Sequence, residues 1–237
     1  MNTQVKNKRF KYPRTMHLPW SPGFTDDDVK GASSEIFNGR DVVITEKMDG
    51  ENTTLYKDHT HARSIDSRHH SSRDWLKRWH SEFAHEIPSG WRICGENLYA
   101  QHSIVYDKLE SYFYGFSIWN DKNYCLSWDE TLDWFRLLEI IAPKVIYRGL
   151  WDEKFVRSFK LDTDVVEGYV VRLAEQFHFD SFNSSVAKWV RKGHVQTDKH
   201  WMHAELKLNG LAEVKLKHQH EPHTATIENK EVSDETK

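Results

Sequence analysis

Short runs of β-branched and aromatic residues recur along the chain, separated by polar stretches that contain glycine or proline. Such runs predict β-strands. The predicted strands cover Asp41–Glu46, Thr53–Tyr56, Trp91–Glu96, Tyr112–Trp119, Val165–Leu173 and Val186–Val190. Residues with helix-type spacing lie between and around these runs, and the mixture predicts an α+β domain built on antiparallel sheets.

Apolar residues four positions apart predict a helix over Arg73–Ile87. Its expected apolar face comprises Trp75, Trp79, Phe83 and Ile87. This spacing favours packing of both tryptophans against the core over stacking on nucleic-acid bases. The cations of the surrounding segment Arg63–Arg78 are candidates for phosphate contacts.

Capping signals predict further helices. Ser127 is followed by Glu130 three positions later, a capping box that opens a helix over Trp128–Ile141. Three shorter helices are expected over Asp26–Ala32, Trp151–Phe159 and Lys199–Leu206.

The two ends of the chain differ in composition from its middle. Lys11–Gly23 carries three prolines and a glycine, which predicts an extended arm. From Lys217 onward the chain is polar and almost free of apolar residues, which predicts disorder. We therefore expect one domain over residues 1–216, beginning with an extended basic arm over 1–23, and a disordered polar tail over 217–237.

Charge and cysteine content narrow the class of protein. The formal net charge is −3, and the tail Glu221–Lys237 alone carries that charge. The rest is neutral overall but has basic clusters at Lys6–Arg14, Arg63–Arg78 and Lys188–Lys199. Two cysteines exclude a disulfide framework and a four-cysteine zinc site. The low cysteine content predicts a reduced intracellular location, a cytoplasm or host cytoplasm. No apolar run approaches eighteen residues, so we expect no membrane partner.

Candidate chemistry gathers around one lysine. The chain has no Walker loop, no G-x-G-x-x-G and no H-E-x-x-H. The segment Glu46–Asn52 reads EKMDGEN, with Lys47 at the end of an apolar strand and Asp49-Gly50 after it. Alone, this pattern is typical of a solvated edge lysine followed by a hairpin turn. The alternative is that Lys47 is a nucleophile held beside a cavity.

Several downstream segments follow Lys47 in a fixed order. They are HARS with Arg63, ICGENL with Glu96, FYGFSI with Phe116, VEGYVV with Glu167 and AKWVR with Lys188. Together with K-x-D-G, this order resembles motifs I, III, IIIa, IV and V of the covalent nucleotidyltransferase superfamily. That superfamily contains ATP-dependent DNA ligases, RNA ligases and mRNA capping guanylyltransferases. The resemblance spans roughly Asp41–Arg191.

Asn52 separates the members of the superfamily. DNA ligases and capping enzymes typically have arginine five residues after the lysine, whereas asparagine resembles RNA ligases of the phage T4 RNA ligase 2 type. The segments KYPRTMHLP, HARSIDSRHH, GENLYA and AKWVRKGHVQT are further similar to compact RNA-ligase-domain proteins of phages and bacteria. The resemblance implies an ATP-dependent RNA ligase with an ATP-grasp-like nucleotidyltransferase core of antiparallel sheets flanked by helices. Because few residues follow Arg191 in this sequence, we expect no OB domain. A DNA ligase core, a GTP-dependent capping enzyme and a catalytically silent RNA-binding module remain alternatives.

The resemblance also implies roles for individual residues. Lys47 is the expected nucleophile that forms lysyl-AMP from ATP, with Lys188 and Glu167 as further catalytic residues. Expected nucleotide-binding residues are Glu46, Lys47, Asn52, Arg63, Glu96, Phe116, Glu167, Lys188 and Arg191, with Phe113 a rival of Phe116 and Lys192 a rival of Arg191. Glu167 and Asp49 are the expected ligands of Mg²⁺ or Mn²⁺. The partners are RNA ends, nicked or single-stranded, bound by a monomer.

Lys47 can act as a nucleophile only when its amine is not protonated. A lysine with its ordinary pKa of about 10.4 is protonated at neutral pH and cannot attack phosphorus. We expect burial, Lys188 and a bound metal ion to lower the pKa of Lys47.

Overall fold

The computed structural model describes residues 8–23, 33–193 and 206–213. The helix expected over Asp26–Ala32 and the tail 217–237 lie outside these ranges, as does the helix expected over Lys199–Leu206 except for its last residue. Residues 1–7 of the predicted arm lie outside as well.

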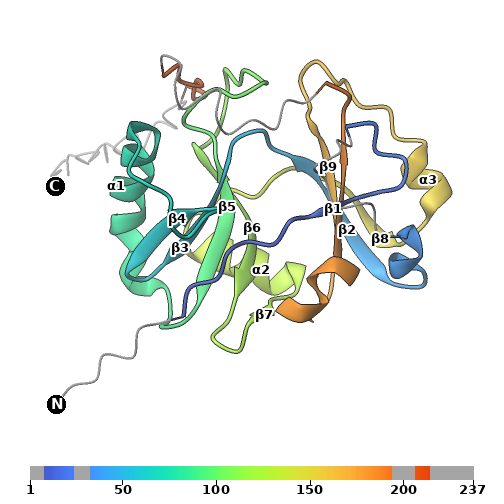
Figure 1. Ribbon diagram of the computed structural model, residues 1–237, viewed down its shortest axis with the longest axis horizontal. Helices are drawn as coiled ribbons and strands as arrows, with labels where there is room; N and C mark the ends of the chain where they lie inside the picture. Colours follow the sequence, from blue (N-terminus) through green and yellow to red (C-terminus); the bar gives the residue numbers. More distant parts are fainter. Residues whose placement is uncertain (1–7, 24–32, 194–205, 214–237) are drawn as a thin grey trace, which may run out of the picture.

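Two β-sheets stand side by side (Figure 1). The first sheet has the order β1 (Met16–His17), β11 (Val186–Val190), β9 (Gly168–Leu173), β2 (Asp41–Lys47) and β8 (Val145–Leu150). The second sheet has the order β10 (Phe177–His178), β7 (Tyr124–Cys125), β6 (Phe113–Trp119), β5 (Arg92–Asn97), β3 (Glu51–Tyr56) and β4 (His59–Ala62). Every neighbouring pair is antiparallel except β1 with β11. The predicted α+β class with antiparallel sheets is confirmed.

Helices cover the outer sides of these sheets, with α1 (Asp74–Phe83) beyond the second sheet and α3 (Glu153–Arg157) beyond the first (Figure 1). The third helix, α2 (Trp128–Leu137), opens with the predicted capping box of Ser127 and Glu130. Short 3-10 turns cover Ser34–Phe37, Ser71–Arg73, Ala84–Glu86 and Phe179–Ser184. None of the helices in the described part of the chain combines the length and the apolar character needed to cross a membrane.

Several predicted elements are shorter than expected: the helix expected over Arg73–Ile87 covers Asp74–Phe83, and the one expected over Trp151–Phe159 covers Glu153–Arg157. Two others have a clear local cause. Helix α2 ends at Leu137 rather than Ile141, because Glu139 has a left-handed φ of 55° and Ile141 forms a β-bridge to Tyr114. Strand β9 begins at Gly168 rather than Val165, because the amides of Val165 and its neighbour donate to the Asp162 carbonyl in a turn.

The cores of the two sheets consist of the predicted apolar positions. Leu76 of α1 packs with Leu55, Ile93 and Phe113 of the second sheet. Trp75 and Trp79 are half-buried against this cluster and stack on each other at 5.5 Å, in agreement with the core packing predicted for them. Cys94 and Cys125 are buried as free thiols in the other large cluster.

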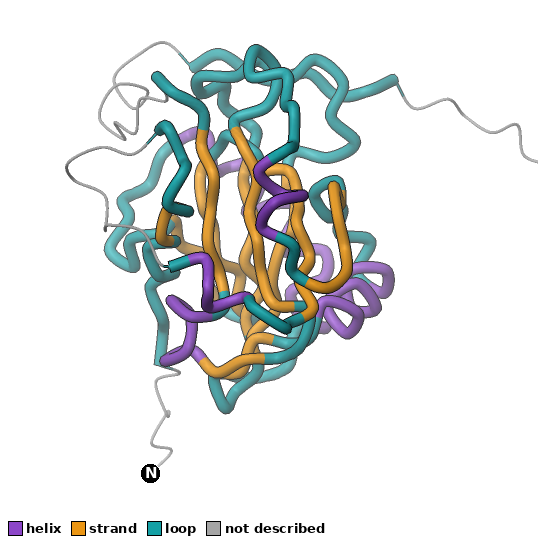
Figure 2. The backbone as a smooth tube through the Cα atoms, turned by 90° about the vertical axis from the view of Figure 1, so that its right-hand side faces the viewer, coloured by secondary structure: helices purple, strands orange, loops and turns teal. Residues whose placement is uncertain are grey.

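The chain passes from one sheet to the other directly after Lys47. Strand β2 ends at Lys47 in the first sheet, and β3 begins at Glu51 in the second, so the Asp49-Gly50 turn is not a hairpin. Gly50 permits a close approach here, since a Cβ on it would lie 2.5 Å from the Asn97 carbonyl oxygen. In Figure 2 the strands run side by side with loops gathered at one end. The lysine therefore lies at a junction between two sheets.

Candidate active site

Lys47 and Glu167 form an ion pair at the ends of two neighbouring strands. Lys47 is paired with Gly168 across the β2–β9 ladder, and its side chain is 22% exposed. Its Nζ lies 2.5 Å from Oε2 of Glu167, whose side chain is fully buried. Gly168 allows β11 to pass closely, because a Cβ there would lie 2.0 Å from the Trp189 carbonyl oxygen. The Glu-Gly pair thus brings a carboxylate to the lysine and leaves room for the next strand.

Three carboxylates determine the protonation of Lys47. Burial acts to lower its pKa, but the charges of Glu167, Glu96 and Asp49 outweigh burial, so the pKa of Lys47 lies above its ordinary value. This direction is opposite to the one expected from the sequence. Burial in turn raises the pKa of Glu167, and it raises the pKa of Glu96 to about 8. The lysine is therefore a cation held among acidic side chains.

Asp49 is fixed by the loop that follows β5. The carboxylate is 3% exposed, and its Oδ2 accepts hydrogen bonds from Ser103 N at 2.8 Å, Ser103 Oγ at 2.7 Å and Ile104 N at 2.7 Å. The Arg191 guanidinium donates to the same Ser103 hydroxyl at 3.3 Å. Arg191 therefore contacts the loop above the site and does not line the cavity, and Lys192 is exposed.

A segment after the last strand holds this loop in place. Asn209 is almost fully buried, and its side-chain amide donates to the carbonyl of Leu98 at 2.7 Å and that of Ala100 at 3.3 Å. Its Oδ1 accepts from the amide of Tyr106 at 2.9 Å. One side chain thus ties both ends of the loop that fixes Asp49. The sequence offered no signal for this role, because the contacts span about a hundred residues.

We expect Asn209→Ala to lower the free energy of unfolding by roughly 1 to 3 kcal/mol, because buried backbone groups lose their partners. Hydrogen exchange of the amides of Ser103, Ile104 and Tyr106 should accelerate at the same time. Urea denaturation and exchange mass spectrometry measure the two effects. The exposed Asn183→Ala is the matched control and should change neither. Unaltered exchange in Asn209→Ala would show that the loop does not depend on this anchor.

A cavity of about 1440 Å³ opens between the two sheets. Its walls bring together the predicted residues Glu46, Lys47, Asp49, Asn52, Arg63, Glu96, Phe116 and Lys188. Asn52 and Glu96 are direct neighbours across the β3–β5 ladder. Phe113 is fully buried in the core and does not reach the cavity, so the described geometry favours Phe116 over its rival.

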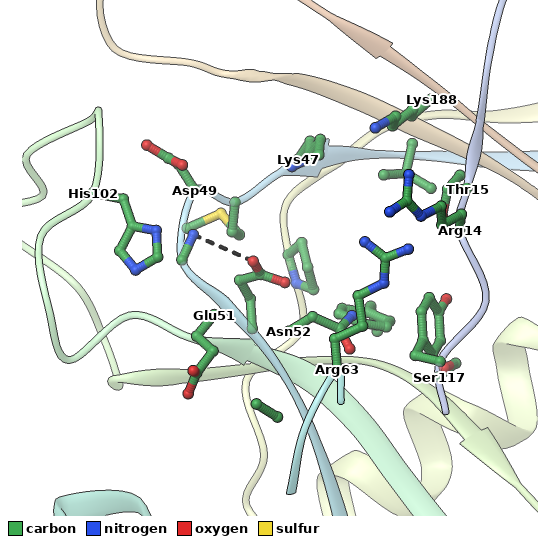
Figure 3. A pocket seen from close by; sticks show the side chains of 18 of the residues that line it. Arg14, Thr15, Lys47, Asp49, Glu51, Asn52, Arg63, His102, Ser117 and Lys188 are labelled. Atoms are coloured by element: carbon green, nitrogen blue, oxygen red, sulfur yellow. Dashed lines mark hydrogen bonds between the residues drawn. The ribbon is translucent and has the colours of Figure 1, made fainter. Parts of the chain in front are cut away.

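Cations and anions occupy different sides of this cavity. Figure 3 shows Arg14, Arg63 and Lys188 pointing into one part of it, while Asp49 and Glu51 point away on the other side. Arg14 belongs to the N-terminal arm, and the sequence placed it only in a general basic cluster. The polarity of the cavity suits a ligand with an anionic portion on the side of the three cations.

A second ion pair, missed by the sequence, supports the floor of the site. Arg73 donates through Nε to Glu51 Oε2 at 2.7 Å and through Nη2 to Glu51 Oε1, and both side chains are only 11% exposed. The remaining nitrogen, Nη1, donates to the carbonyl of Arg68. The pair ties the segment that begins with Arg63 to strand β3.

The described residues do not form a closed metal site. Among them, no group of three or more histidine, cysteine, aspartate or glutamate side chains could hold a metal ion. Glu167 is occupied by Lys47, and Asp49 Oδ2 by the loop. A magnesium-type ion that keeps most of its ligands from substrate phosphates and water needs only one or two protein carboxylates. Asp49 lines the cavity and suits that kind of ion, whereas Glu167 does not line the cavity.

Comparisons with known proteins identify the family from the sequence and find similar folds. The family model for RNA ligase matches residues 40–190. An archaeal ATP-dependent RNA ligase has a similar structure with a TM-score of 0.51 and 17% identity, covering 76% of this chain and 48% of that one. A Naegleria gruberi RNA ligase mutant with ATP and Mn has a TM-score of 0.50 and 16% identity, covering 78% and 61%. No curated protein matches the chain. The chain thus spans less than two thirds of these structures, and at such identity the likeness concerns the fold.

Proposed function

The chain belongs to the RNA ligase family, and from this premise we propose that it joins RNA ends at the expense of ATP through a lysyl-AMP intermediate. The observation that carries the proposal is Lys47 at the junction of two sheets, paired with buried Glu167 and facing a cavity lined by cations. A lysine that serves only as a surface charge does not require a fully buried carboxylate beside it. A nucleophile does require a partner of this kind, because its amine must be held in one orientation toward the phosphorus.

The first step forms a bond between Lys47 Nζ and the α-phosphorus of ATP, while the bond from that phosphorus to the bridging oxygen breaks and pyrophosphate leaves. The ammonium must first lose a proton. Glu167 Oε2, at 2.5 Å and with a raised pKa, is the group positioned to accept it. Lys188, on the cavity wall, would offset charge that develops on the phosphate oxygens.

The remaining steps transfer AMP to RNA and seal the strand. A 5′-phosphate oxygen of RNA attacks the phosphorus of lysyl-AMP, the P–N bond breaks, and Lys47 is regenerated. A 3′-hydroxyl then attacks the activated 5′-phosphate, and AMP leaves. Asn52 and Arg63 line the cavity and would contact the RNA ends. The K-x-x-G-x-N spacing supports the type of RNA ligase found in phage T4.

The adenosine of ATP would lie between the sheets. Phe116 offers a ring to the base, and Tyr12 backs that ring edge-on at 5.3 Å. Glu96, beside Asn52, would accept a hydrogen bond from a ribose hydroxyl. The Naegleria relative was solved with ATP and Mn. A divalent ion here would be held by ATP phosphates with Glu167 or Asp49, and when bound it supplies positive charge that neutralises those phosphates.

Incubating the protein with α-labelled ATP or GTP and Mg²⁺ or Mn²⁺ tests the proposal. We expect ATP to leave label on the protein that survives denaturing electrophoresis and is released by hydroxylamine. The labelled protein should then convert a 5′-phosphorylated RNA to its adenylylated form. Nicked duplex RNA, single-stranded RNA and nicked DNA serve as alternative acceptors.

Other outcomes decide among the remaining functions. Label from GTP but not ATP would indicate a capping enzyme. Sealing of nicked DNA in preference to both RNA substrates would indicate a DNA ligase core. No label from either nucleotide with either metal would contradict the enzyme and leave an RNA-binding module.

A further inference from the structure

The N-terminal arm runs from the second sheet to the first (Figure 1), along the cavity that lies between them. Residues 12–15 all line this cavity, so the arm forms one of its walls. Pro13 restricts the backbone just before Arg14, which favours an extended path. Figure 3 shows the Arg14 side chain pointing into the cavity from this path. The arm is therefore part of the site rather than a loose leader of the domain.

Both ends of this crossing are fixed. On one side, the Tyr12 ring meets Phe116 and Phe182 edge-on, each at 5.3 Å. On the other side, His17 pairs with Lys188 in the parallel β1–β11 ladder, and the Leu18 amide donates to the Lys188 carbonyl at 2.8 Å. Arg14 thus lies between Tyr12, which contacts the Phe116 ring proposed to stack on the base, and the strand that carries Lys188.

Further contacts keep the arm on the first sheet. Ser21 Oγ accepts the Val190 amide at 2.9 Å and the Trp20 indole donates to the Tyr169 hydroxyl at 3.1 Å. Because the arm is anchored before and after Arg14, the position of its Cα is set by the fold. An exposed arginine on such a rigid segment loses less conformational freedom on binding than one on a mobile terminus.

We propose that Arg14, together with Arg63, forms a phosphate subsite of this cavity, additional to the α-phosphate position assigned to Lys47 and Lys188. Figure 3 shows the guanidinium groups of Arg14 and Arg63 pointing into the same space, although they come from different parts of the chain. An anion placed where two guanidinium groups converge is attracted by both of them. Planar guanidinium groups bind phosphate oxygens in pairs.

The ligand of this subsite is a phosphate group beyond the α-phosphate. Within the proposed function it has two sources, the pyrophosphate portion of ATP and the 5′-phosphate of RNA. In both cases Arg14 would contact the group that leaves or attacks at the phosphorus held by Lys47. The inference rests on the proposed function for its role in the reaction, but the binding of phosphate does not depend on catalysis.

Arg14→Ala, Arg14→Lys, Lys11→Ala and the distant Arg136→Ala provide the test. Protein–AMP of each variant is isolated and mixed either with pyrophosphate, which reverses the first step, or with a 5′-phosphorylated RNA. We expect Arg14→Ala to require about tenfold more of one of these two reactants for the half-maximal rate. A loss confined to pyrophosphate assigns the subsite to ATP, and a loss confined to RNA assigns it to the 5′-phosphate.

Calorimetric titration of each unadenylylated variant with sodium pyrophosphate separates this inference from the proposed function. Arg14→Ala should bind pyrophosphate about tenfold more weakly than the wild type even if no protein–AMP ever forms, and Arg14→Lys should restore part of the affinity. Unchanged binding and unchanged kinetics in a folded Arg14→Ala would overturn the subsite. An equal loss in Lys11→Ala would also overturn it, because arm charge alone would then account for the effect.

Discussion

Lys47→Ala is expected to abolish the transfer of label from ATP to the protein, a loss of at least about a thousandfold. Alanine offers no nitrogen to the α-phosphorus, so the covalent route closes while the cavity and its cations remain. The measurement is the rate of label incorporation with Mg²⁺ or Mn²⁺. Binding of ATP, measured separately by calorimetry, should persist in this variant because Phe116, Lys188 and Arg63 are intact.

The matched control is Lys122→Ala, which removes an exposed lysine in the turn between β6 and β7. This variant should be labelled at the wild-type rate. Mass spectrometry of labelled wild-type peptides should find AMP on Lys47. Wild-type labelling of Lys47→Ala would contradict the assignment, and AMP found on Lys188 would identify a different nucleophile in the same cavity.

Arg73→Met is expected to lower the free energy of unfolding by roughly 3 to 5 kcal/mol, because it leaves the Glu51 carboxylate buried without its counter-charge. The loss should appear as a lower midpoint of urea denaturation. It should also slow adenylylation, since the segment that carries Arg63 is no longer tied to β3.

An exposed pair provides the comparison. Arg136 and Asp133 form an ion pair on α2 with side chains 74% and 70% exposed, so Arg136→Met should cost less than about 1 kcal/mol. Adding Glu51→Gln to Arg73→Met should recover part of the loss, because the unpaired charge is removed. A cost of Arg73→Met no larger than that of Arg136→Met would contradict the structural role.

The long strands inside the two sheets could be predicted from the sequence, whereas the edge strands β8 and β4 could not. β2 and β11 are apolar runs buried at the centre of the first sheet, so periodicity and β-branching identify them. β8 and β4 lie at sheet edges. β4 reads HTHA and has no apolar run, and the apolar part of β8 is only the three residues before Arg148 and Gly149. Tertiary pairing, not local preference, makes them strands.

The residues of the candidate site also differ in how far the sequence predicts them. Lys47, Glu96 and Glu167 lie in motifs whose order along the chain could be recognised, and the fold brings them together. Arg14 and Asn209 act through contacts with strands and loops distant in sequence, which no local pattern displays. The direction of the Lys47 pKa was wrong for the same reason. The sequence shows Lys188 as a cation that could lower the pKa of Lys47. It does not show the three acidic side chains that raise this pKa, because their approach depends on how β5 and β9 meet β2.

The passage of the chain between sheets gives the K-x-D-G-x-N spacing an architectural meaning. Lys47 is held by Glu167 in one sheet, and Asn52 is held in register with Glu96 in the other. The residues between them span the distance from one sheet to the other, with Gly50 pressed against the Asn97 carbonyl. An insertion or deletion here cannot be absorbed as in a surface loop, since it must displace one of the two side chains. The number of residues in the motif therefore determines the distance between the two cavity walls between which a nucleotide would fit.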